Sequence, residues 1–365
     1  MAAKRIRLIA VMTGGGDCPG LNAVIRAVVK TAINKYGLVV WGVHVGYLGL
    51  IENRVDRLNY NDVSNILTVG GTILGTSNVA NPFRFAVQAG RRMQYKDVSA
   101  DCVRVLEDRG IDALVCIGGD GTMATAAQFV KKGLTIMGVP KTIDNDLYGT
   151  DVTFGFDTAV TTATEAIDKV HTTASSHHRV MIVEVMGRYA GWIALYAGAA
   201  GGADVILIPE IPYKPARICE YVLERSHRGK RFSIVVAAEG ARAKDGQMVV
   251  SKRIAGSPDP IRLGGIGPRL ADEIGECTGL ECRAVILGHI QRGGTPTPHD
   301  RALATNFGYT AVDLLMKGLK NHLVVLKDGR FSSIPLRHVA GRIRTVPKNH
   351  ALVRAALAVG TSFGV

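Results

Sequence analysis

Two aspartates, Asp144 and Asp146, stand two residues apart in the segment KTIDND, residues 141–146, which follows a run of apolar side chains. Carboxylates this close together at the end of an apolar run are suited to acid–base chemistry. One can accept the proton of an attacking hydroxyl, while the other positions the acceptor or a metal ion. A turn rich in Asp and Asn is the alternative interpretation of this segment.

A third carboxylate, Asp120, lies inside the glycine-rich segment GGDGT, residues 118–122. Consecutive backbone N–H groups in such a turn, ahead of a helix, can bind phosphate. Gly119, Gly121 and Ala124 also fit the loose dinucleotide-binding fingerprint, so a nicotinamide-dependent oxidoreductase is an alternative. Asp120 argues against that alternative because it would repel a bare pyrophosphate, whereas Mg²⁺ between the carboxylate and the phosphates would make it favourable.

A second glycine-rich turn, GGGDCPG at residues 14–20, also lies between a predicted strand and a predicted helix. Three successive glycines are more than a tight turn needs, so this segment is a further candidate phosphate-binding loop. The chain contains no GxxxxGK[ST] segment, which excludes a P-loop enzyme.

The net charge limits the kinds of partner. Lys plus Arg exceed Asp plus Glu by 13 in 365 residues, an excess that suits nucleic acid, a membrane surface or small polyanions. The basic residues are dispersed, with the longest cluster at residues 228–231, and aromatic residues make up only 6%. This pattern favours small phosphorylated substrates and argues against nucleic acid, although a polyanion binder without enzymatic activity remains an alternative.

The cysteines and the lengths of the apolar runs indicate the cellular compartment of the protein. The six cysteines include no CxxC pair, so we expect reduced, largely buried thiols. No run of 18 apolar residues could cross a bilayer, and the first residues do not resemble a signal peptide. We therefore expect a cytoplasmic protein without a membrane partner.

Short β-branched runs alternate with longer amphipathic segments along the chain. The predicted strands are Ile6–Met12, Val39–Val45, Ala113–Ile117, Leu134–Val139, Val180–Val185, Val205–Ile208, Ile234–Ala238 and Ala284–Leu287. The predicted helices are Leu21–Ile33, Thr122–Lys131, Thr158–Thr173, Ile193–Ala200, Ala216–His227, Arg269–Cys277 and Arg301–Met316. Most of these strands are apolar on both faces, which predicts an α/β fold with mostly parallel, Rossmann-like sheets covered by helices. No linker divides the chain, so we expect two interleaved lobes with a cleft between them.

Together these segments resemble the phosphofructokinase family. Five motifs match in the family's order, over roughly residues 5–325: GGDxPGLN at 15–22, GGDG at 118–121, KTIDND at 141–146, EVMGRYAG at 184–191 and LGHIQRGG at 287–294. The resemblance implies two α/β lobes and Mg²⁺-dependent phosphorylation of the 1-hydroxyl of fructose 6-phosphate to fructose 1,6-bisphosphate. It also implies a homo-oligomer, a dimer or tetramer, with sugar-phosphate sites shared between subunits.

The resemblance assigns roles to the residues that match the motifs. Asp144 resembles the base that deprotonates the sugar hydroxyl, with Thr142 and Asp146 beside it, and Asp120 resembles the carboxylate associated with Mg²⁺. The residues similar to the donor-phosphate cradle are Gly15, Gly119, Gly121 and Thr122.

Further residues resemble the family's acceptor site. Arg188 is expected to contact the transferring phosphoryl group, together with Met186 and Gly187, and Glu239 is expected to accept from a sugar hydroxyl. The residues similar to the cluster around the 6-phosphate are Arg179, Arg283, His289 and Arg292.

On this basis we expect three parts in the chain. Residues 1–150, with part of 255–320, would form the donor-binding lobe. Residues 151–254, with C-terminal elements, would form the sugar-phosphate lobe, and residues 335–365 a C-terminal tail.

The donor is ATP or pyrophosphate. In the family, glycine at the position of Gly121 goes with ATP, because an aspartate there would repel the α-phosphate of the nucleotide. Lys141 is more typical of pyrophosphate enzymes, although some ATP enzymes combine this glycine with this lysine. We therefore favour ATP and keep pyrophosphate as the alternative.

The chain also departs from the family's pattern. Asn78 stands where ATP enzymes often have an arginine, for which Arg84 is a candidate substitute, and Thr125 stands where some members have glycine. The nucleotide-effector site of bacterial members is matched only in part, which argues against the same allosteric control. Arg26 is present, but Asp204 replaces a glutamate and His171 replaces an arginine.

The segment GGDGT is also similar to the signature of lipid and NAD kinases. Those families do not carry the 141–146 segment or the segment around Arg188. They remain a remote alternative.

Overall fold

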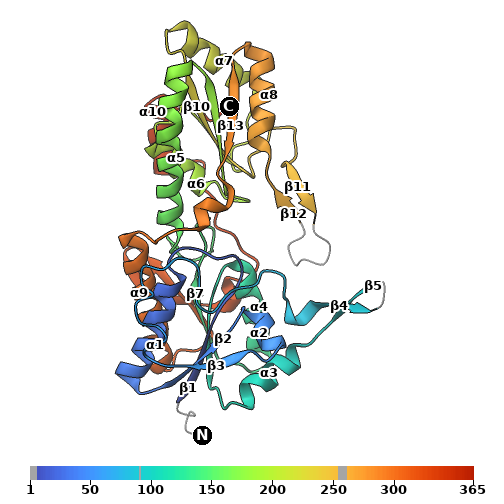
Figure 1. The fold of residues 1–365 in the computed structure, drawn as a ribbon, viewed down its shortest axis with the longest axis vertical. Helices are drawn as coiled ribbons and strands as arrows, with labels where there is room; N and C mark the ends of the chain where they lie inside the picture. The colour runs from blue at the N-terminus through green and yellow to red at the C-terminus, as the bar shows by residue number, and fades with distance from the viewer. Residues whose placement is uncertain (1–5, 90–91, 254–260) are drawn as a thin grey trace.

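Two α/β lobes lie one above the other in the computed structural model, which describes residues 6–89, 92–253 and 261–365 (Figure 1). Each lobe has its own sheet with helices packed on it, so the predicted fold class is confirmed. In the described part of the chain, no helix is both long and apolar enough to span a membrane.

The lower lobe in Figure 1 contains a seven-stranded sheet in the order β15-β14-β7-β6-β1-β2-β3. Its strands are β1 (Leu8–Thr13), β2 (Val39–Val43), β3 (Val55–Leu58), β6 (Ala113–Gly118), β7 (Ile136–Pro140), β14 (His322–Lys327) and β15 (Arg330–Pro335). The five central strands are parallel, and the edge strands β3 and β15 pair antiparallel with their neighbours. All residues of β6 and β7 are buried, as expected for parallel strands with helices on both faces.

Helices from distant parts of the chain cover this sheet. They are α1 (Leu21–Tyr36), α2 (Tyr47–Ile51), α3 (Ser99–Glu107), α4 (Asp120–Lys131) and α9 (Pro298–Met316). α1 and α9 lie side by side although about 260 residues separate them in the sequence (Figure 1). A Cβ on Gly308 of α9 would lie 2.8 Å from Cβ of Ala27 in α1, so the missing side chain allows the two helices to pack closely.

The upper lobe contains a parallel four-stranded sheet in the order β13-β8-β10-β9. Its strands are β8 (Val180–Val185), β9 (Val205–Leu207), β10 (Ser233–Ala238) and β13 (Cys282–Ile286). Its helices are α5 (Phe156–His177), α6 (Trp192–Ala200), α7 (Pro215–His227), α8 (Ile266–Thr278) and α10 (Ala351–Ala358). The chain therefore crosses between the lobes several times, since α9, β14 and β15 return to the lower lobe and α10 belongs to the upper one.

Two hairpins extend from the lobes in Figure 1. They are β4 (Phe85–Ala89) with β5 (Arg92–Lys96), and β11 (Val250–Arg253) with β12 (Ile261–Leu263). Three short 3₁₀ segments complete the described elements: η1 (Pro82–Arg84), η2 (Gly288–Arg292) and η3 (Leu336–His338).

The expectation that all cysteines are reduced is wrong for one pair. Cys219 of α7 and Cys277 of α8 form a disulfide, with their Cα atoms 6.3 Å apart. The two helices pack against each other, and this contact brings together thiols that lie 58 residues apart in the sequence. Cys18, Cys102 and Cys116 are free and buried, as expected.

Candidate active site

The three loops singled out in the sequence meet at one edge of the lower sheet. β1, β6 and β7 are parallel neighbours, and their register places Thr13 beside Ile117 and Gly118 beside Pro140. The strands therefore end level with each other, and the loops that follow them begin together. Backbone hydrogen bonds connect the loops, from the N–H of Gly14 to the carbonyl of Ile117 and from the N–H of Lys141 to the carbonyl of Gly118.

The glycines of these loops serve different purposes. A Cβ on Gly14 would lie 2.8 Å from Oγ1 of Thr122, so that glycine makes room for the buried threonine. Gly15 has a φ of +82°, in the left-handed region that favours glycine. A Cβ on Gly121 would meet no described atom within 4 Å. Glycine at position 121 is thus not required by packing, and the space beside it is open to a ligand.

Two cations hold the first glycine-rich loop in place. The buried Nζ of Lys141 donates to the carbonyl of Gly16 at 2.5 Å, and Nη1 of Arg292 donates to the carbonyl of Asp17 at 3.0 Å. Burial lowers the pKa of Lys141 below its usual value. The loops from β1 and β7 and the 3₁₀ segment η2 are therefore joined by side chains that are also suited to phosphate.

Asp144 lies half-buried among these loops. Burial raises the pKa of its carboxyl group above the usual value, against the opposing charges of Arg292 and Lys141. Its Oδ1 atom is buried and has no hydrogen-bond partner among the described residues. An oxygen in this state is available to accept a hydrogen bond or a proton from a bound hydroxyl.

Asp146 and Thr142 flank Asp144 as expected. Burial, followed by the negative charge of Asp144, raises the pKa of Asp146 to about 7. Oγ1 of Thr142 accepts the N–H of Asp144 at 3.1 Å. The charge of Asp120 also acts on both aspartates, so the carboxylates from two loops form one electrostatic cluster.

The upper lobe contributes the loops that follow β8 and β10. Glu239 follows β10, and its N–H donates to the carbonyl of Val185, the last residue of β8, at 2.9 Å. Burial, followed by the charge of Asp144, raises the pKa of Glu239 to about 7, and Arg188 and Arg292 oppose this shift. Since Asp144 belongs to the lower lobe, the carboxylates of both lobes face a common site.

The segment after β8 carries Met186, Gly187 and Arg188. Gly187 has a φ of +137° and its carbonyl accepts the N–H of Gly240 at 3.2 Å, which ties this loop to the one that follows β10. The guanidinium of Arg188 lies 4.8 Å from the ring centroid of Tyr189. Arg188 also acts electrostatically on Asp144, so the structure brings this arginine to the cluster as expected.

η2 brings His289 and Arg292 to the same region. Gln291, which precedes Arg292, is fully buried, and its Oε1 accepts the N–H of Met186 at 3.3 Å. Gln291 is not among the site residues predicted from the sequence. Its place inside the LGHIQRGG motif was the available signal, but an amide that acts on a neighbouring loop cannot be distinguished from a surface glutamine without the fold.

Arg179 and Arg283 are not part of this cluster within one chain. Arg179 precedes β8 and Arg283 lies near the start of β13, whereas Arg188 and Arg292 follow the opposite ends of these strands. Six residues of β-strand separate the two ends by about 20 Å. Both arginines pair with Glu281, through Nε of Arg179 at 2.9 Å and Nη2 of Arg283 at 2.8 Å.

The residues that depart from the family's pattern have local partners. Thr125 is buried in α4, and its Oγ1 donates to the carbonyl of Gly121 at 3.1 Å. The guanidinium of Arg84 stacks on the ring of Tyr95, 4.4 Å from its centroid. Asn78 follows Ser77, whose carbonyl accepts the N–H of Gly15 at 3.1 Å, so position 78 is adjacent to the first loop.

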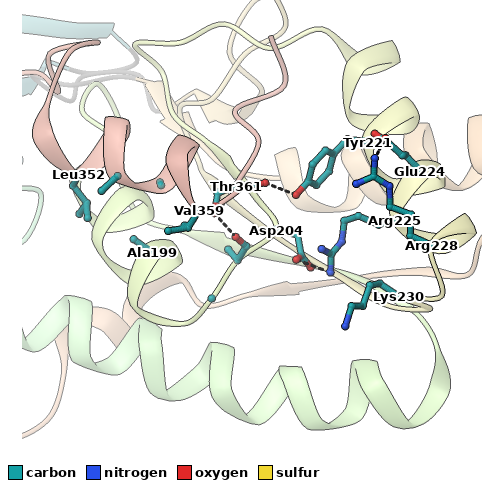
Figure 2. Close-up of a pocket in the computed structure, with 15 residues that line it drawn as sticks. Ala199, Asp204, Tyr221, Glu224, Arg225, Arg228, Lys230, Leu352, Val359 and Thr361 are labelled. Atoms are coloured by element: carbon teal, nitrogen blue, oxygen red, sulfur yellow. Dashed lines mark hydrogen bonds and ion pairs between the residues drawn. The ribbon is translucent and has the colours of Figure 1, made fainter.

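Of the three effector-site positions, Arg26 lies apart from the other two in one chain, while the charge of His171 acts on Asp204. Asp204 lines a pocket of about 700 Å³ in the upper lobe, and its carboxylate pairs with Nη2 of Arg225 at 2.6 Å (Figure 2). Arg26 lies on α1 in the lower lobe, and His171 packs edge-on against Phe232 with their ring centroids 4.9 Å apart. The position of these residues gives no support to control by the same effector site within one chain.

Comparison with known proteins identifies the family of the chain. The family model described as phosphofructokinase matches residues 8–315. The chain is 53% identical to ATP-dependent 6-phosphofructokinase 2 of Clostridium perfringens, over 98% of each chain. It is 49% identical to a pyrophosphate–fructose 6-phosphate 1-phosphotransferase of Amycolatopsis mediterranei, over 93% of this chain and 96% of that one.

A solved structure shares the fold. Pichia pastoris phosphofructokinase in the T-state is 32% identical and matches with a TM-score of 0.79, over 92% of this chain and 36% of that longer one. The matched family model covers both glycine-rich loops, the loop of residues 141–146, the carboxylate cluster and η2. This chain belongs to the phosphofructokinase family.

Proposed function

We propose that this protein is a 6-phosphofructokinase that transfers a phosphoryl group from MgATP to the 1-hydroxyl of fructose 6-phosphate. The observation that carries the proposal is the buried Oδ1 of Asp144, which has no hydrogen-bond partner in the part of the chain that the structure describes. It belongs to a cluster that joins the glycine-rich loops of one lobe to Arg188 and Glu239 of the other. Phosphoryl transfer depends on this combination of positioned reactants, neutralised charge and a base.

In this proposal Asp144 accepts the proton of the attacking hydroxyl. A raised pKa makes its carboxylate a stronger base at neutral pH than an exposed aspartate. Glu239 and Met186 hold the sugar ring, and Thr142 and Asp146 keep Asp144 in place. Arg188 neutralises charge on the transferring group, while His289 and Arg292 bind the 6-phosphate.

The residues present fit Mg²⁺ carried in by the donor phosphates. Among the described residues no group of three His, Cys, Asp or Glu side chains could hold a metal ion by itself. Mg²⁺ commonly uses only one or two carboxylates together with substrate phosphates, and Asp120 is suited to this role. When bound, Mg²⁺ would neutralise charge that develops on the phosphate oxygens.

ATP is the donor that the chain's residues favour. A Cβ on Gly121 would meet no described atom within 4 Å, which leaves room beside it for the α-phosphate of ATP, and the relative from C. perfringens is named for ATP. The relative from A. mediterranei is named for pyrophosphate, so pyrophosphate is the second candidate. Lys141 holds the carbonyl of Gly16, a structural role that either donor permits.

The sugar-phosphate site is completed by a second subunit. Arg179 and Arg283 lie too far from Asp144 to act in their own chain, but they would reach the 6-phosphate bound by a neighbouring copy. Ile286 at the end of β13 and Ile290 in η2 are 53% and 60% exposed, which supports an interface between copies on this side of the molecule. We therefore propose a homo-oligomer, a dimer or tetramer.

The lobes divide the substrates between them. The lower lobe, with residues 1–150, would bind the donor, and the upper lobe, with residues 151–254, would bind the sugar phosphate. We also propose a glycolytic role in the cytoplasm, where sugar phosphates and ATP are exchanged.

A comparison of donors tests the proposal. Purified protein with Mg²⁺ and fructose 6-phosphate should form fructose 1,6-bisphosphate with ATP at a kcat/KM at least about tenfold above that with pyrophosphate. The Gly121→Asp variant should lower kcat/KM for ATP by about 10²-fold or more, because a carboxylate is placed where the α-phosphate lies. Gly121→Ala adds only a Cβ in open space and is the matched control.

Two results would contradict parts of the proposal. Product formation with pyrophosphate alone would replace ATP as the donor and leave the acceptor unchanged. No transfer to fructose 6-phosphate from either donor would reject the proposed activity.

A further inference from the structure

The C-terminal segment 343–346 lies against the loop that carries Asp144. Ile343 forms an antiparallel bridge with Leu147, and the N–H of Arg344 donates to the carbonyl of Asp146 at 2.7 Å. Nη1 of Arg344 donates to the carbonyl of Asn145 at 3.0 Å. The three residues that follow Asp144 are therefore all held by residues 343 and 344.

The other side of the same segment is fixed to the upper lobe. Nε1 of Trp192, the first residue of α6, donates to the carbonyl of Arg344 at 3.1 Å. The guanidinium of Arg344 lies 4.0 Å from the Trp192 ring centroid, a stacked arrangement typical of arginine. Trp192 comes four residues after Arg188, so this contact lies at the end of the loop that carries Arg188.

Glu210 strengthens the connection between the two loops. Its Oε1 accepts the N–H of Val346 at 2.8 Å and the N–H of Gly191 at 3.0 Å. One carboxylate thus holds the C-terminal segment and the start of α6 together. Glu210 itself lies after β9, outside both loops.

The loop that Arg344 contacts needs external support. Asn145 has a φ of +51°, in the left-handed region that costs energy for a residue with a side chain. Its Oδ1 accepts the N–H of Thr153, while its carbonyl is satisfied by Arg344. Without the guanidinium, that carbonyl would lose its partner beside a residue in an unfavourable conformation.

We propose that Arg344 is a positioning residue, which fixes the Asp144 loop at a set distance from the Arg188 loop by bridging Asn145 and Trp192. This role rests on the proposed function, since it matters for catalysis only if Asp144 and Arg188 act on the same substrates. Arg344 touches no reacting group; it acts through the backbone of Asn145 and Asp146.

The test compares Arg344→Met with Arg342→Met in the complete protein. Arg342 lies two residues away and stacks on Tyr148, 5.2 Å from its ring centroid, so it is a matched control. Arg344→Met should lower kcat by about 10- to 100-fold with KM for both substrates changed less than about threefold, since misplacement affects the reacting geometry more than binding. Arg342→Met should leave both constants unchanged.

Backbone hydrogen exchange supplies a readout that does not depend on activity. In Arg344→Met, exchange of the amides in residues 142–147 should rise at least about tenfold, and in Arg342→Met it should not. If the wild-type protein transfers nothing to fructose 6-phosphate, the proposed function fails, whereas this exchange comparison still decides whether Arg344 holds the loop.

Arg344→Lys keeps the test decisive if the methionine variant does not fold. Lysine can still donate to the carbonyl of Asn145 but cannot stack as a plane on Trp192. The kcat and the amide exchange of Arg344→Lys should therefore lie between those of wild type and Arg344→Met. If Arg344→Met does not fold, Arg344→Lys should still show a lower kcat and faster loop exchange than wild type. Equal effects of Arg344→Met and Arg342→Met would overturn the proposal. A raised KM at unchanged kcat, or a lysine variant identical to wild type in loop exchange and kcat, would do so as well.

Discussion

Burial raises the proton affinity of several carboxyl groups in the site, and Glu239 is the clearest case. Its pKa of about 7 lies above the usual value of 4.5. The folded protein therefore binds a proton that the unfolded chain has already lost at pH between these values. Wild-type stability should consequently fall as pH rises from about 4.5 to 7, because ionised Glu239 is less favourable in the folded state.

Glu239→Gln removes this penalty without changing the shape of the side chain. In the absence of substrates, its free energy of unfolding should exceed that of wild type at pH 8 by on the order of 1 kcal/mol or more. At pH 4 the two proteins should be about equally stable. Urea unfolding at both pH values measures this difference, with the exposed Glu220→Gln as the control. A gain of the same size at pH 4 would show that the cause is not ionisation.

The residues of the site were predicted from sequence to different extents. Asp120, Asp144, Asp146 and the glycines stand directly after strands, and side chains at the ends of neighbouring parallel strands must meet. Arg344 gave no such signal, because it lies in a basic tail without periodic pattern and acts through backbone carbonyls. The separation of Arg179 and Arg283 from Asp144 follows from strand direction, which the resemblance alone did not provide.

At the scale of elements, close packing of α1 on α9 joins the N-terminal and C-terminal parts of the sequence that form the lower lobe. Gly308 is the point of closest approach, since a Cβ there would also lie 2.8 Å from the carbonyl oxygen of Val24. The backbone of α1 cannot move away without disturbing the buried side chains around it. Position 308 therefore has room for glycine but not for a residue with a side chain.

Gly308→Ala should destabilise the protein although alanine is the better helix former. We expect a loss of about 1–3 kcal/mol from overpacking, which exceeds the gain of up to about 1 kcal/mol in helix propensity. Chemical denaturation measures the loss, and Asn306→Ala on the exposed face of α9 is the control. If Gly308→Ala were more stable than wild type, the helices could not be as close as described.

The long apolar elements were predicted well, and the others were missed for physical reasons. Each predicted strand and helix is present, because runs such as Ala113–Ile117 are buried on both faces and only one structure fits them. β15 is the edge strand beside β14, and its sequence RFSSIP contains an arginine and two serines, so it forms no apolar run. The hairpins and the five-residue α2 are too short or too polar to give a periodic signal.

For the whole molecule, the proposed sharing of sites between copies can be tested by mixing two inactive variants. Asp144→Ala removes the base of its own site, and Arg283→Ala weakens the 6-phosphate site of the neighbouring copy. A mixed oligomer contains a site with an intact Asp144 and an intact Arg283 from the other chain. Unfolding and refolding the two variants together should therefore restore activity to about a quarter of the wild-type sites in the simplest case of a dimer.

Each variant refolded alone is the control for this mixture. Activity is measured at low fructose 6-phosphate, where Arg283→Ala alone should be nearly inactive because the 6-phosphate loses a cation. A mixture no more active than the sum of the two controls would contradict a shared site and place Arg283 outside the reaction.

The central claim is that the carboxylate of Asp144 takes the proton of the hydroxyl that attacks the donor phosphate. The most direct measurement is kcat and KM of Asp144→Asn with ATP and fructose 6-phosphate, because asparagine keeps the shape but cannot accept the proton. We predict that kcat falls by about 10²–10⁴-fold while both KM values change by less than about threefold. A folded Asp144→Asn variant with turnover close to wild type would contradict the account.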